Sequence, residues 1–187
     1  MPAADRNKSI PSEHLAAAMI CLSLRSSADV VVPAVQFIAE MIRGVAAEKE
    51  IRWIQLGLQE AVRNAFEHGS LEIGSVKKRK LNRKDGALEK NVALRRSAAR
   101  NRGKIIEINA AYSAGVFFCT IEDSGPGFGW RAALKQAKRP PAAAESEGRG
   151  LFLLKKIFDQ IKYNRSGNKI TLIKKFSAKK SNNVRRR

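Results

Sequence analysis

Three polar side chains recur at every fourth position of one predicted helix. Glu60, Asn64 and His68 lie within the run LGLQEAVRNAFEHGS, residues 56–70, and a spacing of four stacks side chains on one helical face. The apolar residues of this segment fall on another face: Ile51, Ile54, Leu58, Ala61, Val62 and Ala65. The pattern therefore indicates one wall of a polar site with a core behind it, or else the solvated face of an amphipathic helix.

A carboxylate stands where a predicted strand ends. Asp123 closes the apolar run 115–123, and Gly125 and Gly127 follow it on either side of Pro126. Glycine has no Cβ, so such a turn lets the backbone approach a ligand closely. The carboxylate can accept a hydrogen bond from an amino group such as the exocyclic amine of adenine. Asp-x-Gly-x-Gly also occurs in ordinary turns, which is the alternative for this motif alone.

A second glycine-rich motif, Gly148-Arg149-Gly150-Leu151, directly precedes a predicted helix. Free N–H groups and the helix dipole make a helix N-terminus attractive to anions, and Arg149 adds a charge-assisted donor. The motif predicts a phosphate-binding turn or, equally, an ordinary start of a helix. It matches neither the Gly-x-x-x-x-Gly-Lys-Ser/Thr loop nor the Gly-x-Gly-x-x-Gly loop.

The elements that would position these motifs follow from periodicity and turn residues. The predicted order is a strand at 19–24, helices at 29–43 and 50–68, one or two surface helices within 75–100, a hairpin of 104–112 and 115–123, a loop at 124–148, a helix at 150–160 and a hairpin of 161–164 and 169–176. Asp29 is the expected N-cap of the first helix, and Gly69 the expected stop of the second. Sequential hairpins imply a mixed, mostly antiparallel sheet with the helices on one face, which is a two-layer α/β sandwich.

The net charge of the 187 residues is +19, and it is unevenly placed. Two segments, 77–104 and 174–187, hold most of the excess Lys and Arg, and the rest of the chain is close to neutral. Such segments bind nucleic acid, acidic protein or anionic lipid, or aid solubility. No nucleic-acid recognition motif accompanies the charge, and 77–104 has no aromatic residue for base stacking. Solubility or an acidic partner is therefore favoured over a nucleic-acid site.

Neither of the two cysteines lies in a metal-ligand spacing. Cys21 and Cys119 each sit inside an apolar run, which predicts two buried free thiols in a reducing compartment rather than a disulfide. The apolar run 15–24 is too short to span a bilayer and weakly resembles a signal peptide, but Glu13 and His14 beside it argue against export. We expect a cytoplasmic protein with no membrane partner.

Taken together and in this order, the three motifs resemble the N box and the two glycine boxes of the GHKL (histidine kinase-like) ATPases. A finer match extends over Glu-Ala-Val-x-Asn-Ala-x-Glu-His-Gly at 60–69, Gly-Arg-Gly-Leu-x-Leu at 148–153 and Asp-x-Ile-x-Tyr-Asn-x-x-Gly-Asn at 159–168. These runs resemble the anti-sigma-factor serine kinases of bacterial partner-switching systems. The resemblance covers about residues 20–176 and implies a Bergerat-type ATP-binding fold.

The resemblance also implies roles for the polar helix. Glu60 would be the general base, and Asn64 would hold the Mg²⁺ that bridges the ATP phosphates. Mg²⁺ typically takes few protein ligands and keeps waters and phosphates as the rest, so one Asn is sufficient. His68 would contact phosphate or the lid, although packing or helix capping fits it equally well.

The two glycine boxes would bind the rest of the nucleotide. Asp123 would read the adenine amino group, with Gly125 in the same turn and Gly127 backing the base. The second box would cradle the phosphates, through Gly148, Arg149, Gly150 and Leu151. The implied cofactors are ATP and Mg²⁺.

The domain organisation that follows has three parts. Residues 1–18 form a variable N-terminal segment, 19–176 the ATP-binding domain, and 177–187 a basic tail. Within the domain, 77–104 is a basic insert and 129–147 is the expected lid over the nucleotide.

The resemblance implies a regulatory serine/threonine-protein kinase that transfers the γ-phosphate of ATP to a small anti-anti-sigma (STAS-type) protein. A sigma factor is a second implied partner, and a homodimer is expected by analogy. Two alternatives stay open: a regulatory module that binds ATP with little catalysis, and a nucleic-acid-associated ATPase that uses the basic segments. Phosphate transfer to a partner separates the first alternative from the kinase.

Overall fold

The structure is a computed structural model and describes residues 18–25, 28–70, 103–137 and 149–176, without the side chains of His68, Ser70 and Gln136. The predicted N-terminal segment, most of the basic insert, the second part of the predicted lid and the tail therefore lie outside the described residues, as do the surface helices expected within 75–100.

Five strands form one sheet in the order β1-β2-β3-β5-β4. Their bounds are β1 Ala18–Arg25, β2 Ile105–Ser113, β3 Val116–Asp123, β4 Gln160–Tyr163 and β5 Lys169–Lys175. Every pairing between these strands is antiparallel. The two predicted hairpins are present as β2–β3 and β4–β5, and the first of them turns through Ala114 and Gly115, both at positive φ.

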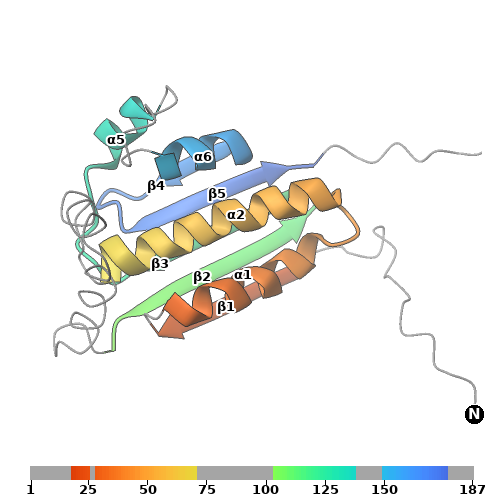
Figure 1. Cartoon of the computed structure of the whole chain (residues 1–187), viewed down its shortest axis with the longest axis horizontal. Coiled ribbons are helices and arrows are strands. Elements are labelled where there is room, and N and C mark those ends of the chain that lie inside the picture. Colours follow the sequence, from red (N-terminus) through yellow and green to blue (C-terminus); the bar gives the residue numbers. More distant parts are fainter. Residues whose placement is uncertain (1–17, 26–27, 71–102, 138–148, 177–187) are drawn as a thin grey trace, which may run out of the picture.

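The helices cover one face of this sheet, as Figure 1 shows for α1, α2 and α6. Their bounds are η2 Ala28–Val30, α1 Val31–Ala39, η3 Glu40–Ile42, α2 Glu48–Asn64, η4 Ala65–Ser70, α5 Trp130–Gln136 and α6 Arg149–Ile157. η4 is a π-helical turn that continues α2. The two-layer α/β sandwich predicted from the sequence is confirmed.

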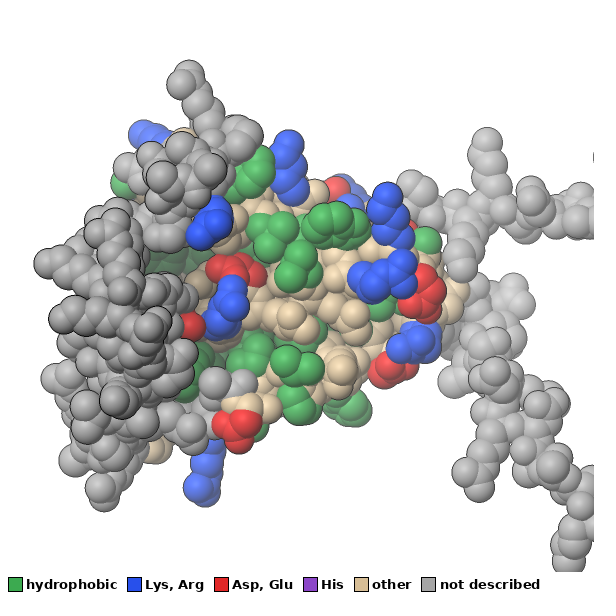
Figure 2. All heavy atoms as spheres, in the orientation of Figure 1, with side chains coloured by type: hydrophobic (Ala, Val, Ile, Leu, Met, Phe, Trp, Pro, Cys, Tyr) green, Lys and Arg blue, Asp and Glu red, His purple; other side chains and the backbone are tan. Residues whose placement is uncertain are grey.

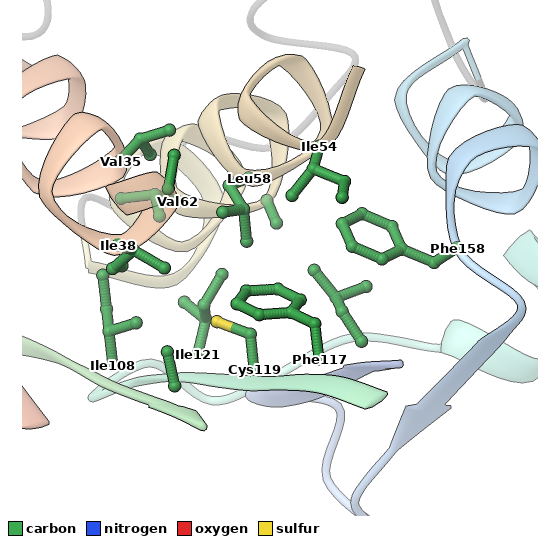
Figure 3. Packing of buried hydrophobic residues seen from close by; sticks show 14 of the residues in the cluster. Val35, Ile38, Ile54, Leu58, Val62, Ile108, Phe117, Cys119, Ile121 and Phe158 are labelled. Carbon is green, nitrogen blue, oxygen red and sulfur yellow. The ribbon is translucent and has the colours of Figure 1, made fainter. Parts of the chain in front are cut away.

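A single apolar core fills the space between the two layers (Figure 3). Side chains of α1, α2 and the segment after α6 point toward those of β2 and β3, with these residues labelled in the figure: Val35, Ile38, Ile54, Leu58, Val62, Phe158, Ile108, Phe117, Cys119 and Ile121. Burial of a side chain of this size stabilises the fold by about 1.5–3 kcal/mol. The same burial raises the pKa of the Cys119 thiol to about 12, so this cysteine is a packing residue.

The other cysteine corrects the prediction of two buried thiols. Cys21 is a free thiol, as is Cys119, but it is exposed. Side chains alternate between the two faces of β1, and Ile20 and Leu22 take the core side. Cys21 therefore lies on the sheet face away from the helices, where its Sγ donates to Asn109 Oδ1 at 2.8 Å.

Helix boundaries differ from the predictions at α1 and α6, and α5 was not predicted. The N-cap of α1 is Val30 rather than Asp29, because a 3-10 turn precedes the helix and contains Asp29. α6 ends at Ile157, since β4 begins at Gln160. α5 occupies part of the stretch predicted as a loop.

Large apolar side chains are also exposed on the helical layer (Figure 2). Four of them belong to α1 and α2: Val32, Phe37, Trp53 and Leu56. None of the helices in the described part of the chain is both long and apolar enough to cross a membrane.

Candidate functional site

The polar face of α2 is centred on Glu60, whose side chain is only 15% exposed. Its Oε1 accepts a hydrogen bond from Asn64 Nδ2 at 3.3 Å. Its Oε2 accepts from Arg63 Nη2, which also makes an ion pair with it. The i, i+4 spacing seen in the sequence thus brings Glu60 and Asn64 into contact, while Arg63 is an additional contact that the sequence analysis did not single out.

The second glycine box meets this carboxylate. Gly150 lies at the start of α6 so close to Glu60 that a Cβ at this position would overlap Glu60 Oε1. A side chain at this position would therefore displace the Glu60 carboxylate from where it lies. Arg149 is exposed beside it, and Leu151 is half-buried and packs against the core. Gly148 lies outside the described residues, so its role stays a prediction.

The end of α2 is not the α-helical stop that the sequence predicted. The α-helix ends at Asn64, and a π-helical turn, η4, carries the chain on to Ser70. Phe66 anchors this turn in the core. π-helical turns inside longer helices often occur at functional sites, and this one carries Gly69 across to the first glycine box.

Gly69 and the first glycine box interlock. A Cβ on Gly69 would overlap the carboxylate of Asp123, and a Cβ on Gly125 would overlap the carbonyl oxygen of Gly69. Asp123 is therefore enclosed by backbone on two sides. The sequence analysis treated Gly69 only as a helix stop; its place at the end of the matched run 60–69 was the signal for a further role. The side chain of His68 is not described, so its contact with phosphate or lid stays a prediction.

Asp123 is a half-buried acceptor. Burial raises the pKa of its carboxyl to about 6, against the hydrogen bond from Gly125 N and the charge of Lys104, which lower it. The Gly125 N–H donates to Oδ1 at 2.7 Å. A carboxylate so placed gains from a neutral donor that enters the site, since removal from water is the main factor that disfavours its charge.

The turn between β4 and β5 supports Asp123 from behind. Asn168 exchanges two hydrogen bonds with it: Asn168 Nδ2 donates to Asp123 O at 2.9 Å, and Asp123 N donates to Asn168 O at 2.9 Å. Asn168 Oδ1 in turn accepts from Asn164 Nδ2 and Ser166 Oγ, at 2.7 and 2.6 Å. This turn belongs to the run 159–168 that carries the family resemblance, but no role was predicted for it.

Gly127 is where the first glycine box touches the same turn. It has φ of +79°, and a Cβ on it would overlap the carbonyl oxygen of Ser166. The next residue fixes the contact, because Phe128 N donates to Ser166 O at 3.1 Å. Gly127 thus joins Asp123 to the β4–β5 turn.

The predicted loop after the first box instead begins with an anchored helix, α5. The Trp130 ring stacks on Tyr163 with centroids 5.8 Å apart, and Phe128 meets Tyr163 edge-on at 5.3 Å. At the other end of α5, Lys155 Nζ donates to Leu134 O at 2.7 Å. Periodicity missed this helix because it has only seven residues, and its packing against β4 and α6 is tertiary.

The contacting segments gather at one end of the sandwich. In Figure 1 the end of α2, the start of α6, the end of β3 and the start of β5 lie on the same side of the molecule. A hollow of about 350 Å³ between α5, α6 and β4 is lined by other residues and is not this site. Among the described residues, no group of three or more His, Cys, Asp or Glu could hold a metal. A metal at this site would therefore need oxygen atoms of water or of a bound ligand to complete its coordination shell.

Comparison with known proteins agrees with this geometry. A family model described as a histidine kinase-like ATPase domain matches residues 24–174, most of the chain and all of the contacts above. No curated protein matches the chain. Because the match spans the polar helix, both glycine boxes and the sheet that joins them, the chain belongs to the family of histidine kinase-like ATPase domains.

Proposed function

We propose that this ATPase-family domain is a regulatory serine/threonine-protein kinase of the anti-sigma-factor type, which passes the γ-phosphate of ATP to a STAS-type partner protein. The observation that carries the proposal is the double junction on α2: Glu60 lies against Gly150, and Gly69 lies against Asp123. One helix and its π-helical extension thereby join a phosphate-binding turn to a base-binding carboxylate.

Asp123 is the group that recognises the base. Its half-buried carboxylate accepts a hydrogen bond from the exocyclic amine of adenine, which replaces part of the hydration lost on burial. Gly69 and Gly125 leave no side chain to block this approach. Guanine and hypoxanthine carry a carbonyl oxygen where adenine has this amine, so the same carboxylate disfavours them.

Asn64 is the residue that would hold Mg²⁺. Its Nδ2 donates to Glu60, which leaves the amide oxygen of Asn64 free to bind the metal. Oxygen is the ligand atom that Mg²⁺ prefers. Bound there, Mg²⁺ would supply charge neutralisation of the ATP phosphates. The exposed Arg149 at the start of α6 adds positive charge toward the same phosphates.

Glu60 is the general base of the transfer. It accepts the proton of a serine or threonine hydroxyl while the hydroxyl oxygen attacks the γ-phosphorus. The bond from this phosphorus to the β–γ bridging oxygen breaks, and ADP leaves with the electron pair. Phosphoryl transfer depends mainly on positioning and charge stabilisation, which the enclosed and hydrogen-bonded Glu60 side chain favours.

The partner class rests on the motif resemblance at 60–69, 148–153 and 159–168. The first test is calorimetric titration of the full chain with ATP, with and without Mg²⁺, for the wild type and Asn64→Ala. We expect Mg²⁺-dependent binding that the substitution removes. Radiolabelled ATP with candidate STAS-type proteins then tests transfer; ATP binding without transfer to any of them would favour a regulatory module with little catalysis.

A further inference from the structure

Arg63 is an exposed arginine that contacts a mostly buried carboxylate. Its side chain is 55% exposed, whereas that of its partner Glu60 is 15% exposed. It lies one position before Asn64 in the last turn of α2, so Arg63 and Asn64 reach the same Glu60 side chain from neighbouring positions.

The two donors address different oxygens of Glu60. Asn64 donates to Oε1 and Arg63 to Oε2, while Gly150 packs against the Oε1 side. A carboxylate held at both oxygens and against a backbone atom has its plane fixed. It also keeps acceptor capacity, because two carboxylate oxygens offer about four lone-pair sites. The arrangement therefore orients the carboxylate without consuming its ability to take a proton.

Orientation matters for a glutamate in this role. The side chain has three rotatable torsions, and a general base must lie within hydrogen-bond reach of the proton that it removes. Asn64 alone is a weak restraint, since its bond to Glu60 is 3.3 Å long and its amide would also serve the metal. A charge-assisted bond from a guanidinium is roughly twice as strong as a neutral one.

We infer that Arg63 is a positioning residue: it holds the Glu60 carboxylate in the orientation that accepts the substrate proton. The inference rests on the proposed function of Glu60 as general base. It requires no contact between Arg63 and the nucleotide, so removal of Arg63 is expected to change turnover and not affinity.

The test measures ATP affinity by calorimetry and, with a STAS-type protein present as the phosphate acceptor, single-turnover ADP formation, both in the full chain with Mg²⁺. Arg63→Ala should lower the rate of ADP formation about tenfold, which is part of the 10²–10⁴-fold that a general base contributes, with the Kd for ATP within about twofold of wild type. Arg63→Lys should recover part of the rate because it restores one charged donor.

A matched control exists on the same helix. Arg52 is also an exposed α2 arginine with a glutamate partner, Glu48 at 3.9 Å, but it lies near the other end of the helix. Arg52→Ala should leave both the rate and the Kd unchanged. A loss of rate in Arg52→Ala equal to that in Arg63→Ala would overturn the inference, because the effect would then be one of helix stability or charge.

A double-mutant cycle separates this inference from the function on which it rests. If Arg63 acts through Glu60, Arg63→Ala should cost nothing further in a Glu60→Gln background. Unchanged or faster turnover in Arg63→Ala, or a Kd for ATP that is tenfold higher, overturns the positioning role of Arg63. If Glu60→Gln still loses turnover in that case, the proposed function of Glu60 stands. No ADP formation by wild type, or full turnover in Glu60→Gln, instead overturns the proposed function itself.

Discussion

α2 and its π-helical extension contact the two glycine boxes at two junctions, and these differ in whether main-chain or side-chain atoms make the contacts. At the first, mainly backbone encloses Asp123: Gly69 and Gly125 approach it through main-chain atoms, and the β4–β5 turn through the main chain and the side-chain amide of Asn168. At the second, side chains hold Glu60: Asn64 and Arg63 donate to its two oxygens, and only Gly150 contributes backbone.

This difference indicates which changes each junction tolerates. An interlocked backbone is damaged when atoms are added, because close-packed neighbours cannot give way cheaply. A side-chain cluster is damaged when a donor or acceptor is removed. The junction at Asp123 should therefore be most sensitive to Gly→Ala changes, and the junction at Glu60 to truncation of polar side chains.

Truncation at the side-chain junction should give the largest effect on turnover. Glu60→Ala removes the proposed general base, so ADP formation should fall by about 10²–10⁴-fold, whereas ATP binding should persist because Asp123 and the proposed metal ligand Asn64 remain. Single-turnover ADP formation beside a calorimetric Kd measures both quantities. Retained turnover in Glu60→Ala would remove the general base from this junction.

Addition at the backbone junction should give the largest effect on binding. In Gly69→Ala the new Cβ would overlap the Asp123 carboxylate, and relief of such overpacking typically costs about 1–3 kcal/mol. We expect the Kd for ATP to rise at least about tenfold and the free energy of unfolding to fall by a similar energy. Calorimetry and urea unfolding would measure these.

Gly129→Ala is the matched control for this change. A Cβ at Gly129 would meet nothing within 4 Å, and its φ of −74° suits alanine. Both Kd and unfolding should stay near wild type. If Gly69→Ala changed the Kd for ATP and the free energy of unfolding no more than Gly129→Ala, then Gly69 would not be tightly packed against Asp123.

The sequence was informative about the fold where the pattern was local. The apolar runs at 19–24 and 115–123 predicted β1 and β3 closely, and the two hairpins implied the antiparallel sheet. The spacing of Glu60 and Asn64 predicted their contact because helix geometry alone decides it. Short α5 was missed because its formation depends on contacts with Tyr163 and Lys155, which lie far along the chain.

The site was predictable as a set of motifs but not as a set of contacts. Asp123, Gly125, Gly127 and Gly150 could be selected because glycine-rich turns have recognisable composition. The pairing of each glycine with its carboxylate could not be predicted, since the π-helical turn at 65–70 redirects Gly69 toward Asp123. A change from α- to π-helical hydrogen bonding leaves no clear mark in residue composition.

Removal of one support behind the backbone junction should change base selectivity. Asn168→Ala deletes the donor to Asp123 O, and a net hydrogen bond is worth about 0.5–1.5 kcal/mol. We expect the Kd for ATP to rise roughly fivefold. The Kd for inosine triphosphate, which lacks the exocyclic amine, should change little, so the preference for ATP narrows.

Asn109→Ala provides the comparison for the selectivity measurement. Asn109 is also an amide whose side chain is hydrogen-bonded, in its case as the acceptor from Cys21 Sγ, but it lies on the sheet face away from the helices. Asn109→Ala should leave the affinities for ATP and for inosine triphosphate unchanged. Equal weakening of ATP and inosine triphosphate in Asn168→Ala would mean that the β4–β5 turn supports the fold rather than the orientation of Asp123.

The smallest expected effect is a pH dependence of ATP binding through Asp123. The Asp123 pKa is raised to about 6 by burial, and the ionised carboxylate is the stronger acceptor for the adenine amine. As pH falls through 6 the ionised fraction drops, so ATP affinity should weaken about fourfold between pH 7.5 and 5.5. In Asp123→Asn, whose amide does not titrate, affinity is lower throughout, and the ratio of its Kd to that of wild type cancels the titration of ATP itself. That ratio should shrink toward low pH; a constant ratio would mean that the Asp123 carboxyl is not the acceptor of the base.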